Sequence, residues 1–400
     1  MTQRLPEQGR SSASLGLVLV VTLFTLFVGF AHKSMCLVDF DDRAYRRYCY
    51  TDLVPLFRSE GFARGAFPYL EAPNEYPVGT GLPMWAASVP ADREGDFFLW
   101  NVLMLSVAGL ATSAALHSVV GRRALLFAAA PSLALYAFLN WDLIPVCLTC
   151  LAVVCFLRGR DVLAGVAVGL GAAAKVFPVV LLPPFVLERT RERRPRDALT
   201  IVGAATVAWA LLNLPIAVLA FDGWTRFVRF SAERAPTPGS TWALVCDAIT
   251  GEVSCGSIAA VNLLSLLAGV AGLVYVFLRG SGVAPAWTLG MAATAVLLLT
   301  SKVYSPQHSL WLVPWFALVL PGLRLYLAFE AADIAMFLAE FGWLGGRLAG
   351  GGVPTWGLRV AQLVRIGVLV LIVLRTTGPR SRVIPATARE PRSRRLRPGT

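Results

Sequence analysis

The side chains that could do chemistry in this sequence gather in polar segments between long apolar ones. Asp52 stands out in the first of these segments because an apolar turn, residues 53–57, follows it directly. A carboxylate that leads into such a turn is expected at a protein–membrane boundary, where burial and nearby cations tune its pKa for work as a general base. The alternative is one more solvated charge in a loop. The pattern favours a catalytic Asp52.

Two further motifs combine polar and aromatic side chains in a way that suits a sugar. Glu75 and Tyr76 precede a proline and could line a sugar subsite, although a proline-stiffened loop end explains them equally well. Asn140, Trp141 and Asp142 offer an amide, a ring and a carboxylate, which match the hydroxyls and C–H faces of a sugar. The alternative is an interfacial Trp beside an Asp that caps the next helix.

Lysine is rare in this chain, and Lys175 and Lys302 both stand at the ends of apolar segments. An ammonium at a membrane surface can hold a lipid-linked phosphate as a point charge, whereas snorkelling to lipid headgroups is the alternative. His308 follows Lys302 closely, so the two cations could neutralise a phosphate together. Tyr304 and Gln307 in the same cluster become candidates for sugar contact. An interfacial histidine is the competing interpretation.

The composition is that of an integral membrane protein. Hydrophobic residues make up 56% of the chain and charged residues 15%, whereas a water-soluble domain carries about 25% charged residues. Hydropathy predicts an all-α, polytopic fold of about twelve transmembrane or re-entrant helices. They form a single domain, residues 13–374. The predicted segments are 13–31, 96–118, 124–140, 142–157, 162–174, 176–188, 198–220, 257–278, 284–301, 308–322, 325–344 and 356–374.

Several parts of this assignment have alternatives. The first apolar segment could be a secretory signal cleaved near 29–31, but its length favours a retained helix after a cytoplasmic tail, residues 1–12. The short segments within 162–188 could be two crossings or one broken, partly re-entrant segment. The basic stretch 375–400, rich in Pro and Ser, is expected to be a disordered cytoplasmic tail.

Short arginine-rich loops set the orientation, because positive loops stay inside. Both termini are then cytoplasmic, and the external (periplasmic) side holds 32–95 and 221–256 together with Asp52, Lys175 and His308. The net charge of +12 follows the same bias, so we expect no nucleic-acid partner. No P-loop, dinucleotide-binding turn or HExxH motif occurs, and we therefore expect no cofactor, no metal site and no nucleotide-driven transport.

Four cysteines fall in the predicted external loops and allow three pairings. Of these, the local pairs Cys36–Cys49 and Cys246–Cys255 are the simplest. Three more cysteines lie within one apolar helix, where a thiol is more often a small buried hydrophobe than a metal or redox ligand. They are Cys147, Cys150 and Cys155.

The sequence resembles glycosyltransferase family 87, a family of the GT-C type that uses polyprenyl-phosphate sugars. The resemblance rests on short motifs at 75–77, 140–142, 175–178 and 305–308 and on Asp52, with Trp311 and Pro314. It implies a multi-helix membrane fold and transfer of a sugar from a lipid phosphate at the outer face, with Asp52 as the base. Related GT-C enzymes often show an acidic pair in that loop. Here Thr51 precedes Asp52, so the neighbouring pair Asp41 and Asp42 competes for the role.

This resemblance implies an enzyme that transfers mannose, or alternatively arabinofuranose, from polyprenyl phosphate to a glycolipid or cell-envelope glycan acceptor. Actinobacterial α-mannosyltransferases are among the family's members. Its partners would be the lipid donor, the acceptor and membrane lipids, and the sequence carries no indication of oligomeric state. Two other classes compete: a lipid or sugar-lipid transporter and a non-catalytic scaffold. A transporter would more often show repeated halves and polar residues at the bilayer midplane, whereas here the polar groups gather at one face.

Overall fold

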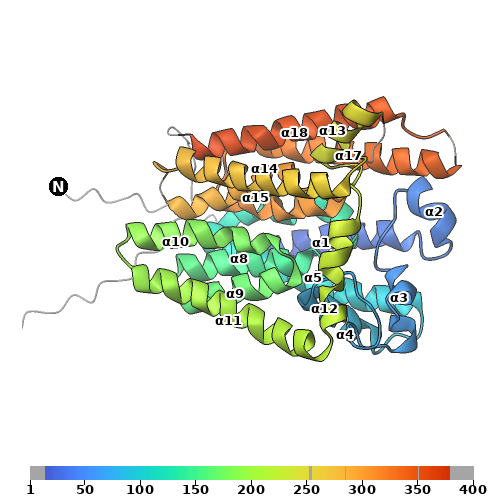
Figure 1. Cartoon of the computed structure of the whole chain (residues 1–400), viewed down its shortest axis with the longest axis horizontal. Coiled ribbons are helices and arrows are strands. Elements are labelled where there is room, and N and C mark those ends of the chain that lie inside the picture. The colour runs from blue at the N-terminus through green and yellow to red at the C-terminus, as the bar shows by residue number, and fades with distance from the viewer. Residues whose placement is uncertain (1–13, 252–254, 284, 350, 379–400) are drawn as a thin grey trace, which may run out of the picture.

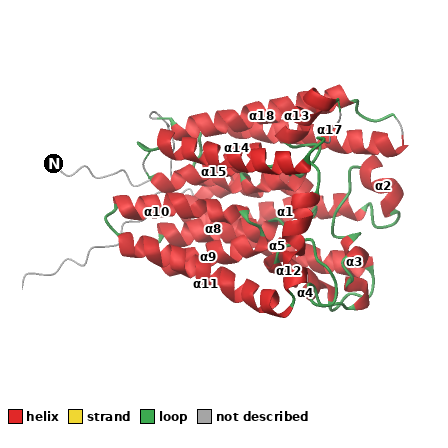
Figure 2. Cartoon of the chain, in the orientation of Figure 1, coloured by secondary structure: helices red, strands yellow, loops and turns green. Residues whose placement is uncertain are grey.

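The computed structural model describes residues 14–251, 255–283, 285–349 and 351–378. All the regular elements within these ranges are helices, and the only bridge is an isolated one between Pro68 and Ala72 (Figure 2). This agrees with the predicted all-α fold. The predicted tail at 1–12 lies outside the described residues, as does the predicted tail from 379 onward, while 375–377 are the end of a helix.

The long helices run roughly parallel or antiparallel to one another, with the chain folding back between two ends of the molecule (Figure 1). The helix α9 packs against α8 and α11, while α18 packs against α15 and α17, and α5 packs against α1 and α8. Their bounds are α1 (Leu15–Ser34), α5 (Glu94–Val120), α8 (Leu143–Leu157), α9 (Asp161–Ala174), α11 (Pro195–Leu219), α14 (Ile258–Arg279), α15 (Leu289–Thr300), α17 (Leu323–Ala349) and α18 (Thr355–Thr377).

Five helical stretches in the described part of the chain are long and apolar enough to cross a membrane. A helix needs about 20 apolar residues to span the hydrocarbon core, because it rises only about 1.5 Å per residue. Large apolar side chains on these helices face outward, such as Leu211 at 73% exposure and Leu266 at 64%. The chain is therefore a polytopic membrane protein. The five stretches are Leu15–Ser34, Glu94–Ala128, Pro195–Leu219, Ile258–Arg279 and Thr355–Thr377.

Some predicted segments are broken rather than continuous. The segment predicted at 124–140 ends its helix α6 (Leu125–Ala128) just before Pro131, which starts the short helix α7 (Pro131–Tyr136). The segment predicted at 308–322 begins as the 3-10 helix η5 (Pro306–Trp311) and ends as α16 (Val313–Leu318). Every residue of η5 and α16 is buried. Irregular backbone is tolerated at this depth because protein, not lipid, surrounds it.

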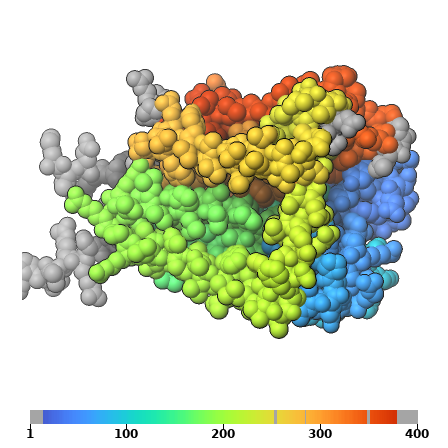
Figure 3. All heavy atoms as spheres, in the orientation of Figure 1, coloured from blue at the N-terminus to red at the C-terminus, as the bar shows by residue number. Residues whose placement is uncertain are grey.

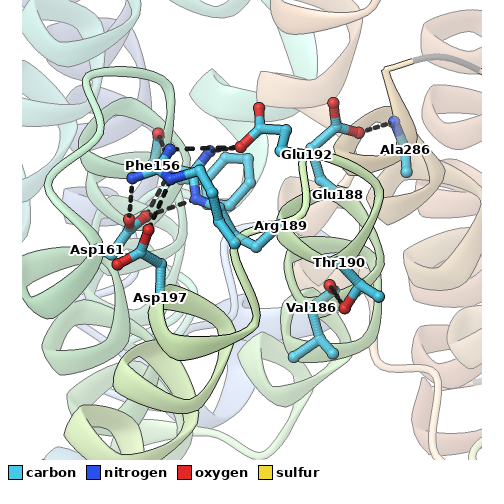
Figure 4. Close-up of polar contacts among 10 residues, drawn as sticks. Phe156, Asp161, Val186, Glu188, Arg189, Thr190, Glu192, Asp197 and Ala286 are labelled. Atoms are coloured by element: carbon cyan, nitrogen blue, oxygen red, sulfur yellow. Dashed lines mark hydrogen bonds and ion pairs between the residues drawn. The ribbon is translucent and has the colours of Figure 1, made fainter.

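The segment 162–188, whose path the sequence left open, is a hairpin. Helix α9 starts at Asp161, and the return limb consists of η3 (Phe177–Leu181) and α10 (Leu182–Arg191). The two open ends of the hairpin meet, because Arg189 Nε donates to Asp161 Oδ1 at 2.9 Å (Figure 4). Lys175 therefore lies at the tip, where its backbone is extended.

The two ends of the molecule differ in character. One end, here called the basic end, carries short loops with arginines at 122–123, 158–160 and 189–194. The other, here called the loop end, is built from the long connections, which fold into short helices that the hydropathy pattern does not reveal. These are α2 (Phe40–Arg46), α3 (Leu56–Ser59), η1 (Phe62–Arg64), α4 (Val78–Ser88), α12 (Phe221–Glu233) and α13 (Thr241–Thr250).

Both local disulfide pairs predicted from the sequence are present. Cys36 bonds to Cys49, which closes the loop that carries α2, and Cys246 bonds to Cys255 beside α13. Cys147 and Cys150 are free thiols buried in α8, as expected for small hydrophobic side chains.

Candidate active site at the loop end

A cavity of about 870 Å³ opens at the loop end of the helices. Its wall is built from the first loop, the tip of the α9–α10 hairpin, α12, α14, the segment 300–311 and α17. Eight of the residues singled out in the sequence line it, although they come from segments far apart in the chain. They are Asp52, Glu75, Tyr76, Asn140, Lys175, Lys302, Gln307 and His308.

The Asp52 carboxylate is held by two hydrogen bonds. Tyr50 Oη donates to Oδ1 at 2.7 Å, and Asn140 Nδ2 donates to Oδ2 at 2.6 Å. The backbone is fixed as well, because Asp52 N donates to Leu139 O at 2.9 Å and the neighbouring Thr51 Oγ1 donates to Phe138 O at 2.6 Å. These bonds tie the first loop to the 138–140 segment and orient the carboxylate towards the cavity.

Burial raises the pKa of the Asp52 carboxyl, while the hydrogen bonds from Tyr50 and Asn140 and the charges of Lys175 and Arg234 oppose the rise. Burial, reinforced by the Asp52 charge, also raises the pKa of the Glu75 carboxyl. A carboxylate with a raised pKa is a stronger base once it is ionised. The two competing candidates for the base, Asp41 and Asp42, lie exposed on α2 and do not line the cavity.

Asn140 links the predicted base to the predicted cation. Besides bonding Asp52, its Nδ2 donates to Tyr76 Oη at 2.7 Å, and its Oδ1 accepts from Lys175 Nζ at 3.5 Å. Lys175 Nζ also donates to Asp142 Oδ2 at 2.7 Å. One continuous network thus joins Asp52 to Lys175.

Three predicted contact residues stand behind the cavity wall instead of lining it. Asp142 is fully buried, accepts from Trp311 Nε1 at 2.7 Å and anchors Lys175. Trp141 packs edge-on against Tyr76 and donates from Nε1 to Asn101 at 2.6 Å. Tyr304 is buried against Ser309, to which its hydroxyl is hydrogen-bonded at 3.1 Å. Direct sugar contact, which we expected of Trp141, Asp142 and Tyr304, does not fit these positions, and they act as supports.

The cations differ in how freely they face the cavity. Lys302 Nζ donates to two backbone carbonyls at the end of α12, Ala232 O at 3.1 Å and Arg234 O at 2.8 Å. Arg234, the C-cap residue of α12, lines the cavity with its side chain half-buried. The sequence reasoning missed Arg234, since it is one of several basic residues in a long loop and the positive-inside rule discounts such loops.

His308 lies in the cavity wall, where the sequence predicted a phosphate-binding cation. Its Nδ1 has no hydrogen-bond partner among the described residues, and the ring stacks on Trp311 with centroids 4.3 Å apart. The ring can therefore exchange a hydrogen bond with a ligand in the cavity, and its role at a phosphate stays a prediction.

One flank of the cavity is apolar. Leu266, Val270 and Leu273 follow one another at helical spacing on α14, and Phe227 and Phe230 of α12 join them. The space-filling view shows the surface hollowed between the gold α14 and the green helices below it, with the yellow-green α12 crossing beside the hollow (Figure 3). The cavity therefore combines a polar end with an apolar side.

The sequence model of glycosyltransferase family 87 matches residues 76–306, which is more than half of the chain. The chain belongs to glycosyltransferase family 87. No curated protein matches it. The matched range contains Asn140, Lys175 and Arg234, whereas Asp52 and His308 lie outside it.

Membership of this family makes the chain a membrane glycosyltransferase, so it requires a sugar donor and an acceptor. This sets aside the transporter and scaffold interpretations. Within the described residues of this family 87 enzyme, no group of three or more His, Cys, Asp and Glu side chains is arranged to hold a metal ion.

Proposed function

We propose that the chain transfers a sugar, with mannose as the first candidate, from polyprenyl phosphate to a glycolipid or cell-envelope glycan at the external face. The observation that carries this proposal is the mixed lining of the cavity. Lys175 and Arg234 line it with cationic groups suited to a phosphate, Asp52 lines it with a carboxylate, and Leu266, Val270 and Leu273 of α14 add an apolar wall. A phosphate with a long isoprenoid chain matches both the cationic groups and the apolar wall in one molecule.

The chemistry follows from these positions. Asp52 accepts the proton from an acceptor hydroxyl while that oxygen forms a bond to the anomeric carbon of the donor sugar. The bond between the anomeric carbon and the phosphate oxygen breaks, and polyprenyl phosphate leaves with the electron pair. Lys175 and Arg234 stabilise the charge that grows on the phosphate. Tyr50 and Asn140 keep the carboxylate oriented through the hydrogen bonds described above.

The charge distribution supports an external active site. Arginines of the short loops gather at the basic end, which the positive-inside rule assigns to the cytoplasm. The cavity and both disulfides belong to the loop end, and disulfides form in oxidising compartments.

The test is a transfer assay with purified protein, labelled polyprenyl-phosphate mannose or polyprenyl-phosphate arabinose, and a panel of acceptors that includes an inositol mannoside. We expect transfer by the wild type and a loss of about 100-fold or more in kcat for Asp52→Asn, the usual range for removing a general base. Asp42→Asn is the matched control, because Asp42 is the exposed competitor, and it should retain activity. An inactive wild type with both donors and all acceptors would refute the transfer proposed here.

The pH profile gives a second readout for the same residue. Because the pKa of Asp52 is raised above that of a free aspartate, the carboxylate becomes protonated, and kcat/KM falls, at a higher pH than an exposed aspartate would require. Glu75 titrates in the same cavity, so Glu75→Gln is measured alongside. The acidic limb should persist in Glu75→Gln and vanish from the residual activity of Asp52→Asn. The reverse pattern would move the base to Glu75.

A further inference from the structure

A third carboxylate, besides Asp52 and Glu75, lines the cavity from the side of α17, and the transfer chemistry described above does not use it. Glu340 is 3% exposed, and its Oε2 has no hydrogen-bond partner among the described residues. Leaving such an oxygen unpaired is unfavourable, and more so for a charged group. An oxygen of this kind at a cavity wall can accept a hydrogen bond from a ligand hydroxyl or amine.

Glu340 shares one guanidinium with a second buried carboxylate. Arg365 of α18 donates from Nη2 to Gly239 O at 2.7 Å, lies 3.6 Å from Asp333 and stacks over the Tyr304 ring at 3.8 Å. Asp333 also accepts from Ser309. Arg365 Nη1 has no hydrogen-bond partner among the described residues. This cluster therefore holds both a donor and an acceptor that a ligand hydroxyl could pair.

Gly239 lets the chain pass directly beside this cluster. A Cβ atom at that position would lie 2.8 Å from both Arg365 Nη2 and Glu340 Oε2, closer than side-chain carbons approach such atoms. A side chain here would therefore displace the carboxylate or the guanidinium.

An aromatic wall connects Glu340 to the proposed base. Phe341 follows Glu340 on α17, and its ring packs with those of Tyr45 and Tyr50 in a triangle. The ring centroids are 6.0 Å apart for Tyr45 and Phe341, 5.0 Å for Tyr45 and Tyr50, and 6.5 Å for Tyr50 and Phe341. All three rings line the cavity, and the Tyr50 hydroxyl is the group that bonds Asp52. The aromatic rings thus lie beside Glu340 at one end of the wall and reach Asp52 at the other.

We propose that Glu340, Tyr45 and Phe341 form the acceptor subsite and that the acceptor presents a sugar ring there, with a hydroxyl that donates to Glu340. Sugar C–H faces pack on aromatic rings, and sugar hydroxyls donate to carboxylates. The donor phosphate binds at Lys175 and Arg234, which leaves the Glu340 side of the cavity to the acceptor. This inference rests on the proposed function only in placing acceptor and donor in one cavity.

Binding of methyl α-mannoside, methyl α-glucoside, methyl α-galactoside and methyl α-arabinofuranoside, measured by saturation-transfer NMR on purified protein without donor, tests the subsite. We expect at least one glycoside to bind the wild type and to bind Glu340→Ala about tenfold more weakly or worse. Glu330→Gln is the matched control, because Glu330 is a buried carboxylate on the same helix, bonds Ser132 and does not line the cavity. Binding should survive in Asp52→Asn, whose transfer is lost.

Two results would overturn the proposal. One is the failure of all four glycosides to bind the wild type, and the other is equal affinity in Glu340→Ala and Glu330→Gln. If Glu340→Ala does not fold, Tyr45→Ala replaces it, since Tyr45 is half-buried on the short helix α2. The same tenfold weakening is expected there, and unchanged affinity in Tyr45→Ala would also refute the subsite. Because no donor is present, failure of the polyprenyl-phosphate assay leaves this measurement interpretable.

Discussion

At the scale of single residues, the two cavity lysines should behave differently when each is replaced. Lys175 Nζ is held by side chains, Asp142 and Asn140, and faces the cavity, whereas Lys302 is occupied by backbone carbonyls of α12. We expect Lys175→Met to raise the KM for the lipid donor by about tenfold, which corresponds to a loss of about 1.4 kcal/mol in binding free energy. Lys302→Met should lower Tm, because it removes two bonds to the end of α12, and change KM less.

Donor titrations and thermal unfolding of both variants in the same lipid nanodiscs check this difference. An equal rise in KM for the two variants would contradict it and would make Lys302 a direct phosphate ligand.

Residue types found part of this site from sequence alone. Asp52 and Lys175 were identifiable because each is an ionisable group beside apolar sequence, and such groups are costly near a membrane. Arg234 and Glu340 also line the cavity, but neither stands out beside apolar sequence. Arg234 follows a helix in a polar connection, and Glu340 belongs to a helix with several charged residues. Asn140 was noticed as an amide suited to a sugar hydroxyl. That it bonds Asp52 depends on the fold and not on local sequence.

At the scale of elements, the first disulfide should control activity as well as stability. The Cys36–Cys49 bond closes the loop that carries α2 and ends immediately before Tyr50 and Asp52. Closing a loop of about this size stabilises a fold by about 3 kcal/mol. Replacing both cysteines with serine should therefore lower Tm and reduce kcat, since the Tyr50–Asp52 hydrogen bond loses its rigid support.

The second disulfide is the matched control for this prediction. Cys246–Cys255 closes a loop of similar size beside α13, and neither of its cysteines lines the cavity. Serine replacements there should lower Tm by a similar amount with kcat retained. Equal losses of kcat in the two double variants, compared at a temperature where both are folded, would show that the first disulfide has no special link to Asp52.

Hydropathy located nearly every membrane segment, but it did not reveal which segments are broken into short helices. Apolar composition is enough to predict α1, α11, α14 and α18, because a lipid-facing helix must be apolar along its length. It could not tell that 306–318 consists of two short buried elements, since a segment surrounded by protein is as apolar as one surrounded by lipid. The amphipathic α12 was missed for the opposite reason: its charged face lowers the average hydropathy of a segment that forms part of the cavity wall.

At the scale of the whole molecule, charge is divided between the two ends. The basic end contains a buried cluster in which Arg189 bonds Asp161 and Glu192 and closes the α9–α10 hairpin (Figure 4). The cavity lies at the tip of the same hairpin. Helix α9 has 14 residues and is therefore about 21 Å long, shorter than the hydrocarbon core of about 30 Å. If the basic end meets the cytoplasmic interface, Lys175 sits below the external interface, where an isoprenoid phosphate drawn slightly into the bilayer would reach it.

This arrangement predicts which end of the protein water-soluble reagents reach from outside the cell. Asp222 on α12 is exposed at the loop end, and Ser281 after α14 is exposed at the basic end. A membrane-impermeant maleimide should label Asp222→Cys in intact cells, and Ser281→Cys only after the membrane is permeabilised. The unaltered chain is the background control. Cys147 and Cys150 are buried and four other cysteines are paired, while Cys155, free and half-buried near the basic end, sets the background after permeabilisation. The opposite pattern would place the cavity in the cytoplasm, where a donor presented at the outer face could not reach Lys175.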